Sequence, residues 1–357
     1  MRAPAFLRAL SMKIPARSSA SATVAPWPCR SSFDECLIEK LEILMCHHDH
    51  DECTNYSSAS WLTSALETSI AVQKMTIESI LENNNGSCDV QDGDRKAVDE
   101  FVEDVVELLD SCNRLRDRLE SVQKYIDSLR TVLHCLDGRY CAEPSEAMLG
   151  RARAGLECCE TMERRCAMLD KCSSGLRKLA EKIIAQGATL PTCGSKTLIS
   201  TSSSSIETPC SELPSILSGS KAISILICGV FDIALSFKSK RGLPVIQHAN
   251  STAWSSCLQG LHKELKEEIE KRRRSSNVVF NELREVVSAA KNLRDLVNFP
   301  WHENKARRVE LRTSVQEVRR TCDVLEEGIR PFEGRINELY RNLISSRVAL
   351  LDLLSQA

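Results

Sequence analysis

Between Val98 and Leu133, apolar residues recur three or four positions apart along the chain. They are Val98, Val102, Val105, Leu109, Cys112, Leu115, Leu119, Val122, Ile126, Leu129 and Leu133. Side chains at this spacing share one face of an α-helix, so the pattern predicts a helix from about Asp94 to Leu136 that buries this stripe against other helices. A strict 4-3 alternation is typical of a long coiled coil, and it is interrupted between Cys112 and Leu115. We therefore expect this helix to pack within its own chain as one member of a bundle.

Comparable apolar stripes predict helices before and after this segment. These helices are expected at about 33–46, 58–82, 145–187, 251–298 and 301–354, the last bent or broken at Gly328 and Pro331. Ser57 or Ser58 is the predicted N-cap of the second of them. Together the stripes predict an all-α fold, an elongated bundle of long antiparallel helices with coiled-coil-like packing.

The distribution of apolar and polar residues divides the chain into parts. Residues 1–32 are basic and rich in Ser and Ala, which predicts a disordered basic tail or a transit peptide, unless Met12 is the true initiator. The remaining parts are an N-terminal helical block at 33–187, a Ser/Thr/Pro-rich linker at 188–220, and a hydrophobic segment with the C-terminal helical block at 221–357. We expect 33–357 to form one domain.

The composition favours helices and argues against a nucleic-acid binder. Aromatic residues make up 4% of the chain, too few for an all-β sandwich or barrel, whereas 42% hydrophobic residues are enough to fill a core. Lys and Arg total 47 against 49 Asp and Glu, a balance without the basic excess of a nucleic-acid-binding domain. No nucleic-acid partner is therefore expected.

The chain contains 17 cysteines and no CxxC pair. Several of them, including Cys112, Cys159, Cys166 and Cys322, occupy positions in the helical stripes where Leu or Val would otherwise stand. Buried thiols behave as small apolar side chains. This usage indicates a reducing compartment rather than a disulfide-rich secreted protein.

The segment 222–237 is a long apolar run between flanking lysine and arginine residues. Its candidate membrane-facing residues are Ala222, Ile225, Ile227, Phe231, Asp232, Leu235 and Phe237. As a helix it would span roughly 24 Å, less than the ~30 Å hydrocarbon core of a bilayer, and Asp232 near its middle opposes insertion. The pattern favours a buried helix of the bundle. The alternative is a segment that inserts into a membrane or contacts anionic lipid at its surface.

Two polar clusters are further candidates for chemistry. Residues 46–53 are dense in Cys, His, Asp and Glu, but their spacing favours a solvated turn over a metal site. The densest basic cluster, interpreted as a solvated and salt-bridged helix face, comprises Arg272, Arg273 and Arg274, followed by Ser275 and Ser276. The alternatives for this cluster are a nuclear signal, a lipid-binding patch and a basophilic kinase site.

Catalytic motifs are missing from the sequence. It holds no GxSxG, HExxH, GxGxxG or P-loop pattern. We therefore predict that the protein is not an enzyme, and we expect no catalytic residue, no cofactor and no metal. The long apolar stripes indicate other proteins as partners.

Four stretches resemble the plant BYPASS-related family. They are Trp61–Glu67, Val105–Asn113, Val132–Asp137 and Leu325–Leu354. The apolar run 222–237 also lies where such proteins usually carry one. The resemblance covers about residue 33 to the end and rests on packing motifs. It implies an all-helical plant protein without known catalytic residues.

The resemblance also implies a biological role. Members of that family are tied to root and shoot development through restraint of a mobile growth-arresting signal, and relatives are linked to secretory or stress pathways. We thus expect a regulatory or scaffold protein that acts by helix-mediated protein contacts, or alternatively a peripheral or monotopic membrane protein anchored by 222–237. Members differ in localisation, so cytoplasm, membrane and, through residues 1–32, chloroplast all stay open.

Overall fold

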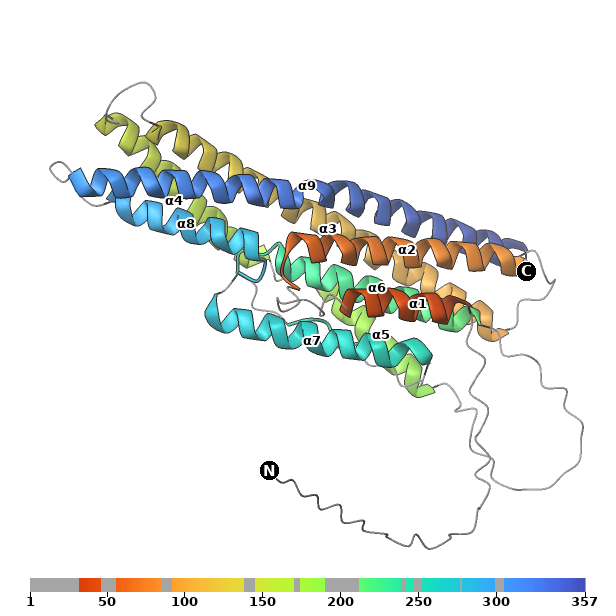
Figure 1. The fold of residues 1–357 in the computed structure, drawn as a ribbon. Coiled ribbons are helices and arrows are strands. Elements are labelled where there is room, and N and C mark those ends of the chain that lie inside the picture. The colour runs from red at the N-terminus through yellow and green to blue at the C-terminus, as the bar shows by residue number, and fades with distance from the viewer. Residues whose placement is uncertain are drawn as a thin grey trace, which may run out of the picture. The chain divides into compact units, whose positions relative to one another are not determined.

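The computed structural model describes residues 32–45, 56–84, 92–137, 145–169, 174–189, 212–238, 242–246, 252–276, 278–298 and 305–356. Over these ranges the regular structure is α-helical and contains no strand, which confirms the predicted all-α fold (Figure 1). The helices are α1 Ser32–Met45, α2 Ala59–Asn84, α3 Asp92–Leu136, α4 Glu146–Leu169, α5 Ser174–Thr189, α6 Leu213–Ala234, α7 Ala253–Ser275, α8 Asn281–Asn298 and α9 Lys305–Gln356. All of them belong to one compact unit, residues 31–357. The predicted tail up to residue 31 and the metal candidates at 46–53 lie outside the described residues.

The long helix α3 is the predicted stripe-bearing helix, and it packs against α4, α5, α6 and α9. Its stripe is buried as expected, except that Leu109 is half-buried and Leu108 is fully buried in its place. The irregular step of the stripe therefore falls between Val102 and Leu108 rather than between Cys112 and Leu115. Contact with four helices requires a wider apolar face than a coiled-coil seam, which explains the shift. Coiled-coil-like packing remains a prediction.

The helices α3 and α9 lie side by side and run antiparallel (Figure 1). Arg130 of α3 pairs with Glu326 of α9, while Asp137, just past the end of α3, pairs with Arg319. The contacts on α9 thus move toward its start as those on α3 move toward its end. This matches the predicted antiparallel arrangement.

Helices α3 and α6, in contrast, form a parallel pair. Asp104 and Arg118 of α3 pair with Lys221 and Asp232 of α6, in that order, so both helices run in the same direction. The two helices between them in the sequence, α4 and α5, both run antiparallel to α3, so the chain returns to the direction of α3 in α6. Gly155 and Glu163 of α4 lie against Val132 and Tyr125 of α3, and Gly175 and Lys182 of α5 lie against Glu107 and Asp104. The stripe pattern alone did not indicate this pairing.

The linker predicted at 188–220 is shorter in the structure at its C-terminal end. Helix α6 begins at Leu213, with Pro214 in its first turn, where the missing N–H of proline has no helical partner to lose. Residues 213–220 are therefore helical. The Ser-rich composition of the linker concealed this start, because the apolar positions Leu213, Ile216 and Leu217 were grouped with the linker.

The single helix predicted at 251–298 is two helices in the structure. Helix α7 ends at Ser275, and Ser276 is extended with φ −154° and ψ 149°. The apolar residues Val278 to Phe280 are buried. The ring centroids of Phe280 and of Phe332 in α9 are 6.2 Å apart. The chain leaves the helix because this turn places Phe280 in the core. Within the helix predicted at 145–187 the structure describes α4 and α5, and residues 170–173 between them lie outside the described residues.

The helix was predicted to bend or break near Gly328 and Pro331. A break is wrong, because α9 continues through both residues, and a bend stays a prediction. A proline inside a helix costs about 3 kcal/mol by removing one hydrogen bond and crowding the preceding turn. Buried Ile329 and Phe332 flank the proline and hold the helix against its neighbours. Tertiary packing therefore outweighs the local penalty.

Candidate functional site

The apolar segment 222–237 lies inside the helical unit. Its candidate membrane-facing residues are buried in the structure, apart from half-buried Asp232. By length and composition α6 is the one described helix that could cross a membrane: its 18-residue window has a mean hydropathy of 1.7, and 89% of that window is buried. The core helix of a soluble protein passes the same test. The burial is that of a core helix.

The charged residues of α6 have partners on neighbouring helices. The Lys221 ammonium lies 2.8 Å from Asp104 of α3, and the side chains of both are at most 5% exposed. Lys182 of α5 lies 2.8 Å from the other carboxylate oxygen of Asp104. Asp232 accepts a hydrogen bond of 2.6 Å from Arg118 of α3. Each charge that would oppose membrane insertion of α6 is thus paired within the unit.

The buried side-chain amide of Gln73 connects α2, α6 and α9. Gln73 of α2 donates hydrogen bonds to Ser220 and Ser224 of α6 at 2.8 and 2.9 Å. Ser346 of α9 donates to the carbonyl oxygen of the same amide at 3.3 Å. This contact was not predicted from the sequence, although Ser220 and Ser224 are four residues apart and so share one side of the helix.

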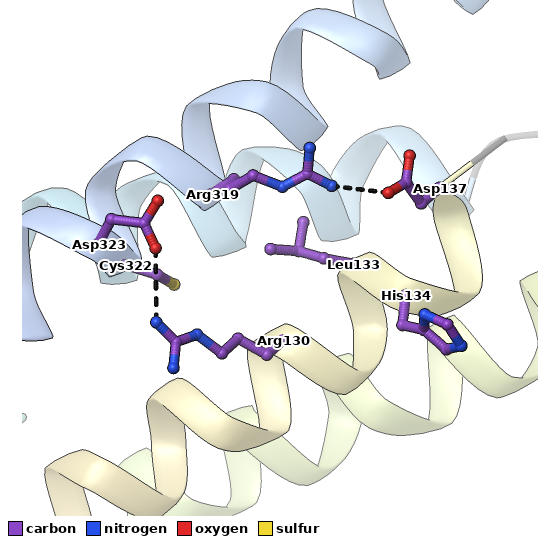
Figure 2. A pocket seen from close by; sticks show the side chains of 7 residues that line it. All are labelled: Arg130, Leu133, His134, Asp137, Arg319, Cys322 and Asp323. Carbon is purple, nitrogen blue, oxygen red and sulfur yellow. Dashed lines mark hydrogen bonds and ion pairs between the residues drawn. The ribbon is translucent and has the colours of Figure 1, made fainter. Parts of the chain in front are cut away.

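A surface hollow of about 280 Å³ lies between the end of α3 and α9. Its lining is charged, as Figure 2 shows, and consists of Arg130, Leu133, His134, Asp137, Arg319, Cys322 and Asp323. None of these residues was predicted to form a site. Their spacing on two separate helices explains this, because only the antiparallel pairing of α3 and α9 brings them together.

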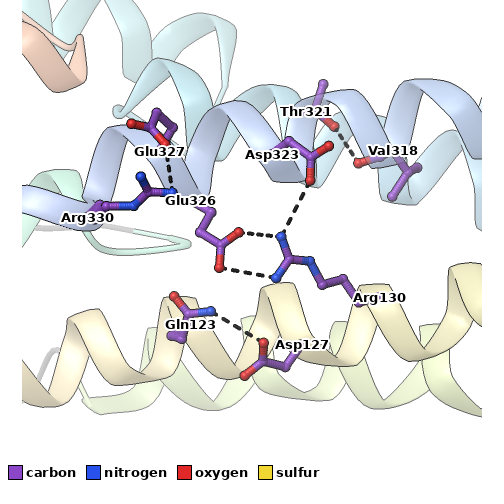
Figure 3. Close-up of polar contacts among 9 residues, drawn as sticks. All are labelled: Gln123, Asp127, Arg130, Val318, Thr321, Asp323, Glu326, Glu327 and Arg330. Atoms are coloured by element: carbon purple, nitrogen blue, oxygen red, sulfur yellow. Dashed lines mark hydrogen bonds and ion pairs between the residues drawn. The ribbon is translucent and has the colours of Figure 1, made fainter.

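Both arginines of the hollow are paired with carboxylates. Arg319 donates to Asp137 at 3.0 Å, and Arg130 lies between Asp323 and Glu326 of α9 (Figure 3). The hydrogen bond between Arg130 and Glu326 raises the pKa of the guanidinium and lowers the pKa of the carboxyl. An anionic ligand would have to displace these acids, so the hollow is poorly suited to bind one.

Cys322 lines the hollow, and its thiol is a candidate nucleophile. Burial raises the pKa of this thiol to about 12, although the nearby Arg130 lowers it in part. A thiol with this pKa is protonated at neutral pH and is a poor nucleophile. The lining residues therefore do not form an activated cysteine site. Among the described residues no group of three or more His, Cys, Asp or Glu side chains could hold a metal ion.

The predicted basic cluster lies at the end of α7, where it faces α8. Arg272 donates to Glu268 at 2.6 Å and also to Asn281 at the start of α8. Arg273 donates to Glu270 at 3.4 Å. These pairs fit the interpretation as a salt-bridged helix face, while Ser275 is exposed.

An exposed apolar row on α9 is a feature that sequence analysis missed. Ile344, Val348 and Leu351 are 40%, 51% and 45% exposed. Their spacing of four and three residues places them on one face of the helix. We call these three residues the α9 patch. None of the three belonged to the predicted stripe of this helix, and the sequence alone does not show whether a second apolar row on a long helix is covered by a neighbour.

Helix α2 carries an exposed apolar residue of its own, Leu81. Lys74 of α2 pairs with Glu338 of α9, and Gln73 contacts Ser346. Leu81 lies two turns beyond Lys74 on the same side of α2 and is 49% exposed. The register of these contacts places Leu81 level with the α9 patch along the helix axis, but the α2-facing residues Glu338 and Ser346 lie on the opposite side of α9 from the patch.

The fold and these surfaces define an all-α helical-bundle protein. Residues 210–354 match the model of a family described as Protein ROH1-like. The chain is 29% identical to UPF0496 protein 4 of Oryza sativa subsp. japonica over 61% of this chain and 44% of that protein. It is 30% identical to Protein ROH1D of Arabidopsis thaliana over 31% of this chain and 29% of that protein. The chain spans less than half the length of these curated relatives, and no solved structure matches it.

The comparisons thus support similarity to plant ROH1-like and UPF0496 proteins. The matched region 210–354 begins just before α6 and includes the α9 patch. The narrower resemblance to the BYPASS-related family stays a prediction.

Proposed function

We propose that the protein is a non-enzymatic regulatory or scaffold protein of plant root and shoot development that acts by helix-mediated protein contacts. The α9 patch carries this proposal, because three exposed aliphatic side chains at helical spacing are the usual anchors for a partner helix. Exposed Arg341 and Asp352 flank the patch. We propose an amphipathic helix of another protein as the occupant, with charges that complement these two residues.

The developmental role rests on resemblance. Plant ROH1-like and UPF0496 proteins are similar to this chain, and the BYPASS-related resemblance implies restraint of a mobile growth-arresting signal. Two features of the hollow support a role in protein contacts over a role in chemistry. Arg130 and Arg319 are each paired with a carboxylate, and burial raises the pKa of the Cys322 thiol.

Site-directed photo-crosslinking tests the proposed docking face in plant cells. A photoreactive residue in place of Val348 should form adducts with another protein, and Ile344→Glu should abolish them. The same probe at Val309 is the matched control, because Val309 is also an exposed aliphatic residue of α9. Equal adducts from both positions, or none from position 348, would contradict the proposal.

The second candidate is a peripheral or monotopic membrane protein anchored by 222–237. The apolarity and length of α6 favour it, whereas the partners of Lys221 and Asp232 on α3 favour a core position. Carbonate extraction of plant membranes distinguishes the two. Release of the protein into the soluble fraction would exclude insertion of α6, and retention in the pellet would favour it.

A further inference from the structure

Ser275 is the last residue of α7 and directly follows three arginines. Its side chain is exposed, and its hydroxyl donates a hydrogen bond of 2.9 Å to the carbonyl of Arg272. The next residue, Ser276, has an extended conformation. For an enzyme to bind the chain around Ser275, the last turn of α7 has to unwind and Arg272 has to leave its contact with Asn281 of α8. Helix ends open at low cost.

We propose that Ser275 is a phosphorylation site for a kinase of the arginine-directed class. Such a kinase would bind Arg272 and Arg273, three and two positions before the acceptor, through carboxylates that match the guanidinium groups. In the reaction the Ser275 oxygen attacks the γ-phosphorus of ATP. The bond from that phosphorus to the bridging oxygen of ADP breaks, and the hydroxyl proton passes to the catalytic aspartate of the kinase.

Ser276 has the same arginine spacing one residue later, but its environment is different. Its side-chain oxygen accepts a hydrogen bond of 3.2 Å from the Val278 amide, and its own amide donates to the Arg272 carbonyl at 2.8 Å. Ser276 is also partly buried. Its hydroxyl therefore holds the turn into α8, whereas the Ser275 hydroxyl contacts only its own helix. The structure thus selects Ser275 as the acceptor.

Phosphorylation would act on the junction between α7 and α8 through Arg272. This arginine bridges Glu268 on its own helix and Asn281 on α8. A phosphate on Ser275 is one turn from the same guanidinium and carries nearly two negative charges at neutral pH, so it competes for Arg272. It also lies at the negative end of the α7 dipole, which loosens the last turn.

The junction continues to the start of α2. The backbone N–H of Asn281 donates a hydrogen bond to the Ser57 carbonyl at 2.9 Å. The Glu282 carboxylate accepts a hydrogen bond from the backbone N–H of Ala59, also at 2.9 Å. Loss of the Arg272 contact to Asn281 would therefore loosen residues 57–60 together with 278–284. Phosphorylation of exposed Ser275 would thus weaken the packing between the start of α2 and the start of α8.

The direct experiment treats the purified full chain with MgATP and the catalytic subunit of cyclic-AMP-dependent protein kinase, which is a probe of the arginine-directed class. Intact-mass and peptide spectrometry then give the number and position of the phosphates. We expect one phosphate on Ser275 in the unmodified chain and in Ser276→Ala, and loss of this phosphate in Ser275→Ala. No incorporation, or incorporation that persists in Ser275→Ala at Ser276, would overturn the proposal.

A second readout tests the effect on the junction. Hydrogen exchange of peptides covering 278–284 and 57–60 should speed up after phosphorylation, while peptides of the middle of α3 should exchange as before. The Ser275→Ala protein, treated with kinase and ATP in the same way, is the matched control. Unchanged exchange at both segments in the phosphorylated chain would overturn the proposed effect on the junction.

Discussion

Asp104 and Asp232 are acidic side chains at the interface of α3 and α6, and each faces a cation from the other helix. A buried ion pair adds little net stability over apolar packing, but removal of one partner leaves an uncompensated charge in the interior. These pairs therefore fix which helix lies next to α6 and in which direction it runs. The chemistry of single residues thus specifies the parallel packing of α3 and α6.

Asp104→Ala should lower the free energy of unfolding by about 3–5 kcal/mol, because the buried Lys221 would lose its ion pair with Asp104. Lys182→Met is the matched control: Lys182 contacts the same carboxylate, but its side chain is 53% exposed, so its loss should cost about 1 kcal/mol or less. Urea denaturation monitored by circular dichroism gives both values. Equal losses for the two variants would contradict the assignment of Asp104 and Lys221 as the buried pair.

Glu163 provides a pH-dependent test. Burial raises the pKa of its carboxyl above the usual value, although the hydrogen bond from Tyr125 at 2.8 Å lowers it in part. Since the folded state then binds the proton more tightly than the unfolded state, this carboxyl contributes its full stability below pH 4.5 and loses it as the pH rises through the raised pKa. Glu163→Gln should therefore gain stability relative to the unmodified protein at pH 7.

Denaturant unfolding of the Glu163→Gln variant at pH 7 and pH 4 measures this effect. The amide still offers an oxygen to the Tyr125 hydroxyl, so the comparison isolates the charge. The advantage of the variant should shrink at pH 4. An advantage that is the same at both pH values would show that the charge of Glu163 is not responsible.

At the scale of elements, the sequence predicted where helices occur better than where they end. The α3 stripe and the Ser58 cap, which accepts a hydrogen bond of 3.3 Å from the Trp61 amide, follow from local spacing and local chemistry. The break after Ser275 and the continuity at Pro331 do not, because both depend on packing between Phe280 and Phe332. Tertiary packing overrides local helix propensity where residues far apart in the sequence are buried against each other.

Two glycines of α9 make this point testable. A Cβ on Gly328 would lie 2.8 Å from the Cβ of Ala59 in α2, whereas a Cβ on Gly334 would meet nothing within 4 Å. Gly334→Ala should stabilise the protein by about 0.8–1 kcal/mol through helix propensity. Gly328→Ala should destabilise it by about 1–3 kcal/mol, because the overpacking separates α9 from α2. Thermal and urea unfolding of both variants checks the opposite signs; stabilisation by both would contradict the close approach of α2.

At the scale of the whole chain, the pairing of distant segments is what the sequence could not provide. The hollow between α3 and α9, the Gln73 contact to α6 and the α9 patch each depend on residues far apart in sequence or on which face of a helix stays open. The candidate residues of α6 and the basic cluster were identifiable because each is a contiguous run. Their partners, such as Asp104 for Lys221 at a separation of 117 residues, were not.

We propose that the protein works through the α9 patch and not through chemistry in the hollow between α3 and α9. The test is complementation of a plant line that lacks the protein, with root and shoot growth as the measurement. One allele carries Ile344→Ser, Val348→Ser and Leu351→Ser, and the other carries His134→Ala with Arg319→Gln. Both sets replace exposed or half-buried side chains, so both proteins should accumulate and fold.

We predict that the hollow variant restores growth as well as the unmodified chain does, and that the patch variant does not, although both accumulate to the same level. Restoration of growth by the patch variant, or failure of the hollow variant to restore it, would contradict the proposal.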